Sequence, residues 1–345
     1  MDRYFSKVPG QVYLWIAILI FGASSAVTRK LTEVGATQFM NGHNPISLCN
    51  VLFVGNVCAL GLMSIVYRHQ LTAENFGKIS KAEWINLTIV AILSGAVAPA
   101  AIFRALALSP VNNIILLGRL EVPLIIILSR IVLQERLNRY QKIGAFVVIV
   151  GIVVAVIGDR FSCREAMPTD LAKSGLVIGT GEVLTITAAI VSAIATLINK
   201  QKLSDIPVGI YGIFRTGVGS IVFFISAIVL YGSGHFAEMF SPFLWQWMLV
   251  YGGVIVVVGQ SLWITGSRKS SLTVATIVSC FHPIAGMLFA YWILAELPTN
   301  LQVIGSIILL TGLLLSQIKS DRQQRISQPS ELHPSSQDGS GFSGF

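Results

Sequence analysis

Ionisable and amide side chains inside long apolar runs are the residues of this sequence best suited to chemistry. A charged group at the centre of a bilayer costs at least about 2.5 kcal/mol, so the few that occur there often mark a solute or ion pathway. We therefore expect the substrate-binding residues to come from this set. Its members are Asn56, Asn112, Arg119, Glu121, Arg215 and His282.

Arg119 lies eight residues beyond Val111, which begins its apolar run. In a continuous helix this corresponds to about 12 Å, near the middle of a bilayer core. On that helix Asn112 shares the face of Arg119, whereas Glu121 points to the opposite side. A guanidinium there predicts bidentate binding of a carboxylate or phosphate group. The alternative is a structural salt bridge to a carboxylate on another helix.

The other candidates also have two readings each. Arg215 either faces the solute or extends to the cytoplasmic interface. Glu121 is a counter-charge for Arg215 or His282, or takes part in proton coupling. His282 precedes Pro283, which frees backbone carbonyls, but an isolated imidazole also serves as a packing residue. Asn56 contacts the solute or links two helices by a hydrogen bond.

Motifs for covalent catalysis, phosphate binding or metal binding are not found in the sequence. Three of the four cysteines (Cys49, Cys58 and Cys280) lie in apolar runs, and Cys163 lies alone in a loop. We therefore expect no enzyme activity, no cofactor and no metal site.

The composition is that of an integral membrane protein. The 345 residues are 54% hydrophobic and 12% charged, with a mean hydropathy of +0.74. A soluble domain carries about 25% charged residues. The net charge of +8 comes from short clusters of Lys and Arg between apolar runs, which excludes nucleic acid as the expected partner and favours lipid.

Apolar runs between charge clusters predict about ten membrane spans, and the residues after Lys319 predict a disordered tail. The predicted spans are Val12–Thr28, Pro45–Tyr67, Trp84–Leu108, Val111–Leu133, Ile143–Gly158, Val183–Ile198, Val208–Tyr231, Phe243–Ser267, Ser270–Ala295 and Leu301–Ile318. Lys and Arg are roughly three times as frequent in alternate loops. This bias predicts that both termini are cytoplasmic in a multi-pass plasma-membrane protein, with a bacterial inner membrane favoured.

A duplicated motif divides the chain into halves. Glu135, Gln141, Gly144 and Gly151 form the pattern E-x5-Q-x2-G-x6-G, which recurs from Glu296 at an offset of 161 residues as Gln302, Gly305 and Gly312. Pro123 and Pro283 precede the two motifs, and Ser109 is echoed by Ser270. Five spans per half is an odd number, so the halves must have opposite orientations, a plan typical of secondary transporters.

These motifs resemble the EamA domain of the drug/metabolite transporter superfamily. The stretch Ala105–Ala155 is similar to one copy, Ile264–Ser316 to a second, and the resemblance extends over about residues 11–318. It implies ten helices and a central cavity lined by spans one to four and six to nine. Spans five and ten would be peripheral, often in a homodimer contact.

The sequence thus predicts an all-α membrane protein of two inverted five-helix repeats. Residues 1–158 and 183–318 would be the repeats, 159–182 the connecting loop and 319–345 a disordered cytoplasmic tail. The predicted function is secondary transport of a small organic metabolite by alternating access, driven by a proton gradient or exchange of a counter-solute. An amino acid or another anionic or zwitterionic solute is favoured. The alternative is a receptor or scaffold that retains the fold without transport.

Overall fold

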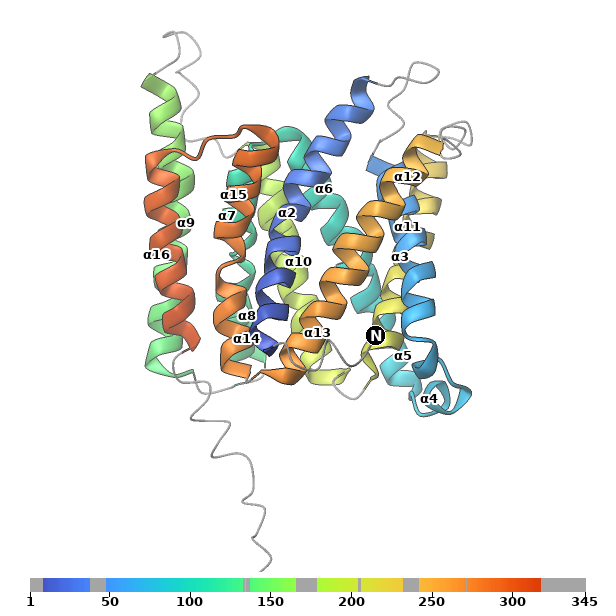
Figure 1. Cartoon of the computed structure of the whole chain (residues 1–345). Coiled ribbons are helices and arrows are strands. Elements are labelled where there is room, and N and C mark those ends of the chain that lie inside the picture. Colours follow the sequence, from blue (N-terminus) through green and yellow to red (C-terminus); the bar gives the residue numbers. More distant parts are fainter. Residues whose placement is uncertain are drawn as a thin grey trace, which may run out of the picture.

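The computed structural model describes residues 9–37, 48–132, 134, 137–165, 179–203, 206–231, 242–270 and 272–317. Within these ranges the regular secondary structure is helical (Figure 1). The predicted tail and Glu135 lie outside the described residues.

The helices run mostly along a common axis (Figure 1). The first half contains α2 (Gly10–Thr37), α3 (Leu48–Val66), η1 (Arg68–Gln70), α4 (Ala73–Gly77), α5 (Lys81–Ile92), η2 (Leu93–Val97), α6 (Ala98–Leu108), α7 (Val111–Gly118), α8 (Glu121–Val132) and α9 (Arg139–Glu165). The second half contains α10 (Thr180–Lys202), α11 (Val208–Tyr231), α12 (Pro242–Tyr251), η4 (Gly252–Val258), α13 (Gly259–Lys269), α14 (Leu272–Cys280), α15 (His282–Leu294) and α16 (Asn300–Gln317).

Seven stretches of the described chain are long and apolar enough to cross a bilayer. They are Gly10–Thr37, Lys81–Leu108, Arg139–Val156, Thr180–Lys202, Leu244–Ser267, Val274–Leu294 and Asn300–Gln317. Asn50–Val66 and Gly209–Ile225 are shorter apolar helices. The predicted span Val111–Leu133 is divided between α7 and α8, each too short to cross alone.

Large apolar side chains cover outward-facing surfaces of these helices. Ile131, Phe146, Val229 and Trp292 are each at least 67% exposed. An aqueous surface rarely carries so much exposed apolar area, whereas a lipid-facing surface requires it. The chain is therefore a multi-pass helical membrane protein.

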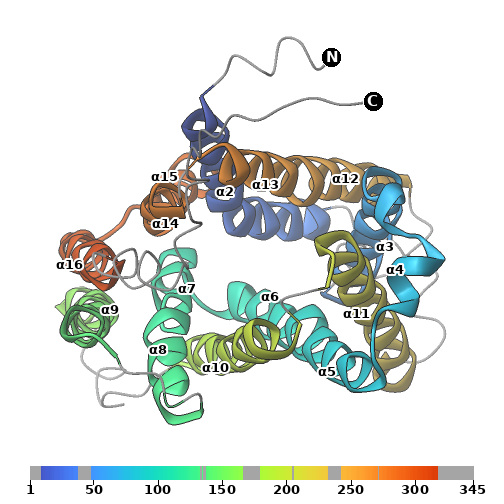
Figure 2. The ribbon, with the colours of Figure 1, turned by 90° about the horizontal axis from the view of Figure 1, so that it is seen from below.

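Helices α9 and α16 form a close antiparallel pair at one edge of the bundle (Figure 2). A Cβ added to Gly151 would lie 2.6 Å from the backbone nitrogen of Leu309, and one added to Gly305 would lie 2.6 Å from the carbonyl oxygen of Gly151. Gly144 and Gly312 meet in the same way further along the pair. The glycines of the two motifs thus bring two backbones together, as small residues do in membranes.

Several local features occur twice, once in each half of the chain. Turns of π-helix interrupt two of the long helices, at η2 and at η4. Gly181 at the start of α10 contacts Ser109 after α6, while Gly10 at the start of α2 contacts Ser270 after α13. Both serines have extended backbone conformations and end their helices.

The remaining side chains of the two motifs also act at helix ends. Gln302 accepts a hydrogen bond from the backbone N–H of Thr299, closing the first turn of α16, and Gln141 does the same for Asn138 before α9. Among the described residues other than glycine, positive φ is adopted by Gln134 (52°) and Ala295 (55°), each directly before the glutamate of its motif. Left-handed backbone is unfavourable for such residues, so its occurrence twice at this point is a specific feature of the fold.

Candidate functional site

Two helices of the bundle are broken at their middle. The helix that begins at α7 stops at Gly118 and resumes as α8 at Glu121, and α14 stops at Cys280 before α15 begins at His282. Pro123 and Pro283 explain the breaks, because proline has no N–H and its ring crowds the carbonyl four residues earlier. Shorter turns close the gaps, with Leu120 N–H donating to the Leu117 carbonyl at 3.0 Å.

The break around Phe281 is closed in the same manner. Its N–H donates to the carbonyl of Val278 at 3.1 Å, three residues earlier instead of four. The ring of Phe281 packs against that of Trp15 on α2, with 5.1 Å between their centroids. Trp15 is thus a packing partner of the break.

Arg119 and His282 meet where these two breaks face each other. The guanidinium Nη2 of Arg119 contacts Nδ1 of the imidazole. A guanidinium can only donate, so a hydrogen bond between these two groups requires Nδ1 to accept. The pair therefore retains the positive charge of Arg119, and it joins two residues that the sequence predicted separately.

Glu121 begins α8, two residues beyond Arg119. Its carboxylate accepts a hydrogen bond of 3.2 Å from the hydroxyl of Thr196 on α10. Neither Arg215 nor His282 provides its described partner. The chain between Arg119 and Glu121 is a turn, so the assumption of one continuous helix through both residues was wrong.

Asn112 lies at the N-terminus of α7, away from the break. It is 1% exposed, and its backbone N–H donates to the Glu296 carboxylate at 2.9 Å. Its side-chain amide donates to the backbone carbonyl of Glu296 at 3.4 Å, while Oδ1 is buried without a partner among the described residues. Asn112 is thus one full turn or more from Arg119 and closer to the end of the bundle.

Arg215 and Asn56 lie on another side of the bundle, where α11 packs on α3 and η2 (Figure 2). A Cβ on Gly95 would lie 2.6 Å from the carbonyl oxygen of Arg215, so the π-helical turn and α11 approach closely. A Cβ on Gly219 would lie 3.2 Å from the amide nitrogen of Asn56. Asn56 therefore lies against α11, while Nε of Arg215 is buried without a partner among the described residues.

Helix termini and the guanidinium of Arg119 set the charge at the breaks, where α7 and α14 end with partial negative charge. Helices α8 and α15 both begin there, and the first N–H groups of a helix carry partial positive charge. Together with the guanidinium they favour a carboxylate or phosphate group. Glu121 offsets part of this charge at the first turn of α8.

The described hollows lie elsewhere. One of about 370 Å³ lies between α2, α12 and η4 and is lined by apolar residues, among them Ile20 and Val254. Another of about 220 Å³ lies between α2 and α6, where Arg29 and Glu33 line it. Neither includes Arg119 or His282.

Three residues that contact α7 or Glu121 were not among those that the sequence singled out for binding. Glu296 holds the N-terminus of α7, Gln302 donates a hydrogen bond of 2.8 Å to Oδ1 of Asn113, and Thr196 holds Glu121. The duplicated motif was the available signal for Glu296 and Gln302. Thr196 carries no signal in the sequence.

Broken helices that face each other within a helical bundle are a construction that membrane transporters use for their solute sites. The comparisons agree with this class. The chain belongs to the EamA-like transporter family, whose model matches residues 8–157 and 179–317.

Relatives of known name are similar over most of the chain. The uncharacterized transporter sll1164 of Synechocystis sp. is 40% identical over 99% of this chain and 97% of its own length. The riboflavin transporter ImpX of Fusobacterium nucleatum is 23% identical over 76% of this chain and 86% of its own length. A solved crystal structure with 15% identity has a TM-score of 0.53 over 89% of this chain and 98% of its own, which supports the fold.

Proposed function

We propose that this protein is a secondary transporter that moves a small anionic or zwitterionic organic solute by alternating access. The contact between Arg119 and His282, at the facing breaks of α7–α8 and α14–α15, carries the proposal. A solute carboxylate would displace the imidazole and bind the guanidinium fork, aided by the starts of α8 and α15.

We further propose that the chain consists of ten helices in two inverted repeats. The paired features of the halves support this arrangement: two π-helical turns, two glycine–serine contacts, two left-handed residues before a glutamate, and two broken helices. The antiparallel packing of α9 on α16 is what an inverted duplication requires. The separate family matches, residues 8–157 and 179–317, also favour one repeat in each half.

The orientation follows from the distribution of charge. Helix α2 begins and α16 ends at the same end of the bundle (Figure 1). Lys and Arg are enriched in the loops of that end, so we place both termini in the cytoplasm of a bacterial cell. Glu121 is the carboxylate that proton coupling would use, with exchange of a counter-solute as the alternative driving force.

The test is solute flux into proteoliposomes for a panel of amino acids, carboxylated metabolites, lipophilic cations and riboflavin. We expect saturable flux of a carboxylated solute, loss of that flux in Arg119→Gln, and partial recovery in Arg119→Lys. Arg104→Gln, at an exposed position of α6, is the matched control. Full flux in both Arg119 variants would contradict the proposed site. Saturable binding without flux would favour the receptor alternative.

A further inference from the structure

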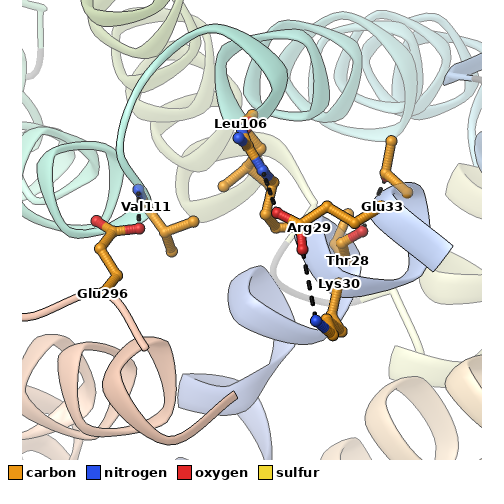
Figure 3. A network of polar contacts seen from close by, with 8 residues as sticks. Thr28, Arg29, Lys30, Glu33, Leu106, Val111 and Glu296 are labelled. Carbon is orange, nitrogen blue, oxygen red and sulfur yellow. Dashed lines mark hydrogen bonds and ion pairs between the residues drawn. The ribbon is translucent and has the colours of Figure 1, made fainter. Parts of the chain in front are cut away.

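The corner between α6 and α7 is held by side chains from two other elements. Arg29 of α2 donates a hydrogen bond from Nη1 to the carbonyl of Leu106, near the end of α6 (Figure 3). Glu296 accepts hydrogen bonds from the backbone N–H groups of Val111 (3.0 Å) and Asn112 (2.9 Å), at the start of α7. Hydrogen bonds from other elements therefore hold both ends of this corner, the end of α6 and the start of α7.

Helix α7 depends on Glu296 for its N-terminal capping. Its N-cap position is Pro110, which provides no side-chain hydrogen bond to the free amides. The left-handed conformation of Ala295 turns the chain after α15, and the N–H of Glu296 donates to the carbonyl of Ala290 at 3.3 Å. This turn directs the carboxylate toward α7, where the helix dipole strengthens both hydrogen bonds.

Arg29 is also held in place. Its Nε lies 3.2 Å from the carboxylate of Glu33, whose other oxygen lies 3.6 Å from Lys30. The hollow of about 220 Å³ beside Arg29 is thus lined by charges that already pair with each other. Because these charges are already paired, we interpret the contacts of Arg29 as structural and not as a ligand site.

We propose that Arg29 and Glu296 form a clamp on the α6–α7 corner that closes the solute pathway at the end opposite the termini. The proposal rests on alternating access as proposed above. Helix α7 leads from the corner to the break at Arg119, so in this proposal the corner moves when the pathway opens at that end. Both contacts have to break in the state that is open there.

Cys280 is a natural reporter of this opening. It is 4% exposed and ends α14, directly before the break at Phe281. A variant in which Cys49, Cys58 and Cys163 are replaced by alanine leaves Cys280 as the sole thiol. Its reaction with a membrane-impermeant methanethiosulfonate reagent is measured from each side, in intact cells and in inside-out vesicles.

In Arg29→Gln, Glu296→Gln and the double variant, we expect faster labelling of Cys280 from the side opposite the termini and slower labelling from the other side. One charge-assisted hydrogen bond corresponds to a change of about tenfold in the equilibrium. Arg29→Lys retains a donor and should return labelling toward that of the parent. Arg104→Gln should leave it unchanged.

Three results would overturn the clamp. Labelling from both sides that neither Arg29→Gln nor Glu296→Gln alters would refute the clamp while leaving alternating access intact. Labelling that increases equally from both sides would show general loosening of the fold. Access to Cys280 from one side alone, in the parent and every variant, would refute alternating access itself and the clamp with it.

Discussion

Arg119 and His282 are 163 residues apart in the chain, yet the guanidinium of one contacts Nδ1 of the other. Each residue lies at the break of a different helix, and the two breaks are made by prolines four and one positions further on. The imidazole occupies a position on the guanidinium that a solute carboxylate would need. Under the proposed function His282 would act as an internal competitor of the solute, and its removal tests this relationship directly.

We predict that the effects of Arg119→Gln and His282→Ala on solute affinity are not additive. Removing Arg119 should weaken binding strongly, whereas removing His282 alone frees the guanidinium and should raise the affinity moderately. The double variant should resemble Arg119→Gln, with a coupling energy of about 0.5–3 kcal/mol. Isothermal titration with the preferred solute measures this cycle. Independent, additive losses would show that the two residues act separately.

The α9–α16 contact predicts that the stability of the protein depends strongly on the glycines in it. Gly151→Ala and Gly305→Ala place a methyl group 2.6 Å from backbone atoms of the facing helix, and such overpacking costs about 1–3 kcal/mol. A Cβ added to Gly61 of α3 would meet no atom of another element within 4 Å, so Gly61→Ala should be neutral or stabilising. Thermal unfolding in detergent compares the three variants. Equal melting temperatures would contradict the close approach.

Replacement of Ala295 by glycine should stabilise the protein. The φ of 55° costs an alanine about 1 kcal/mol or more, which glycine does not experience. Ala91→Gly is the control, because Ala91 is buried in the interior of α5 and should lose about 1 kcal/mol there. The melting temperature should therefore rise in the first variant and fall in the second. A fall in both would mean that the turn before Glu296 is not strained.

The proposed topology predicts opposite accessibility for two exposed positions. In a variant without native cysteines, Lys78→Cys after α4 should react from the cytoplasmic side, and Thr37→Cys at the end of α2 from the other. An impermeant maleimide applied to intact cells and to inverted vesicles distinguishes the two sides. Reaction of both positions from one side would contradict the orientation.

Local signals in the sequence predicted much of this architecture. The apolar runs of the sequence include the seven candidate membrane spans of the described chain, and the duplicated motif contains the glycines that pack α9 against α16. Ser109 and Ser270, which echo each other in the sequence, both end a helix in extended backbone. The role of Glu296 could not be predicted, because the amides that it caps are 184 and 185 residues away.

The candidate site was predictable in composition but not in geometry. Arg119 and His282 stood out as ionisable residues in apolar runs, and their contact depends on how two broken helices face each other. The same extrapolation that placed Arg119 treated α7 and α8 as one helix, although Pro123 gave a reason to expect a break. The surroundings of Arg215 could not be predicted, because the approach of α11 to Gly95 depends on a π-helical turn that has no clear sequence signal.

The glycine contact between α9 and α16 also has a consequence for biosynthesis. Helix α9 leaves the ribosome long before α16, which is the last helix of the described chain. Until α16 arrives, the face formed by Gly144 and Gly151 meets lipid and cannot complete its packing. The N-terminal half therefore remains incompletely packed in the membrane until α16 is inserted. A chain that terminates before Asn300 should be a substrate for membrane quality-control proteases.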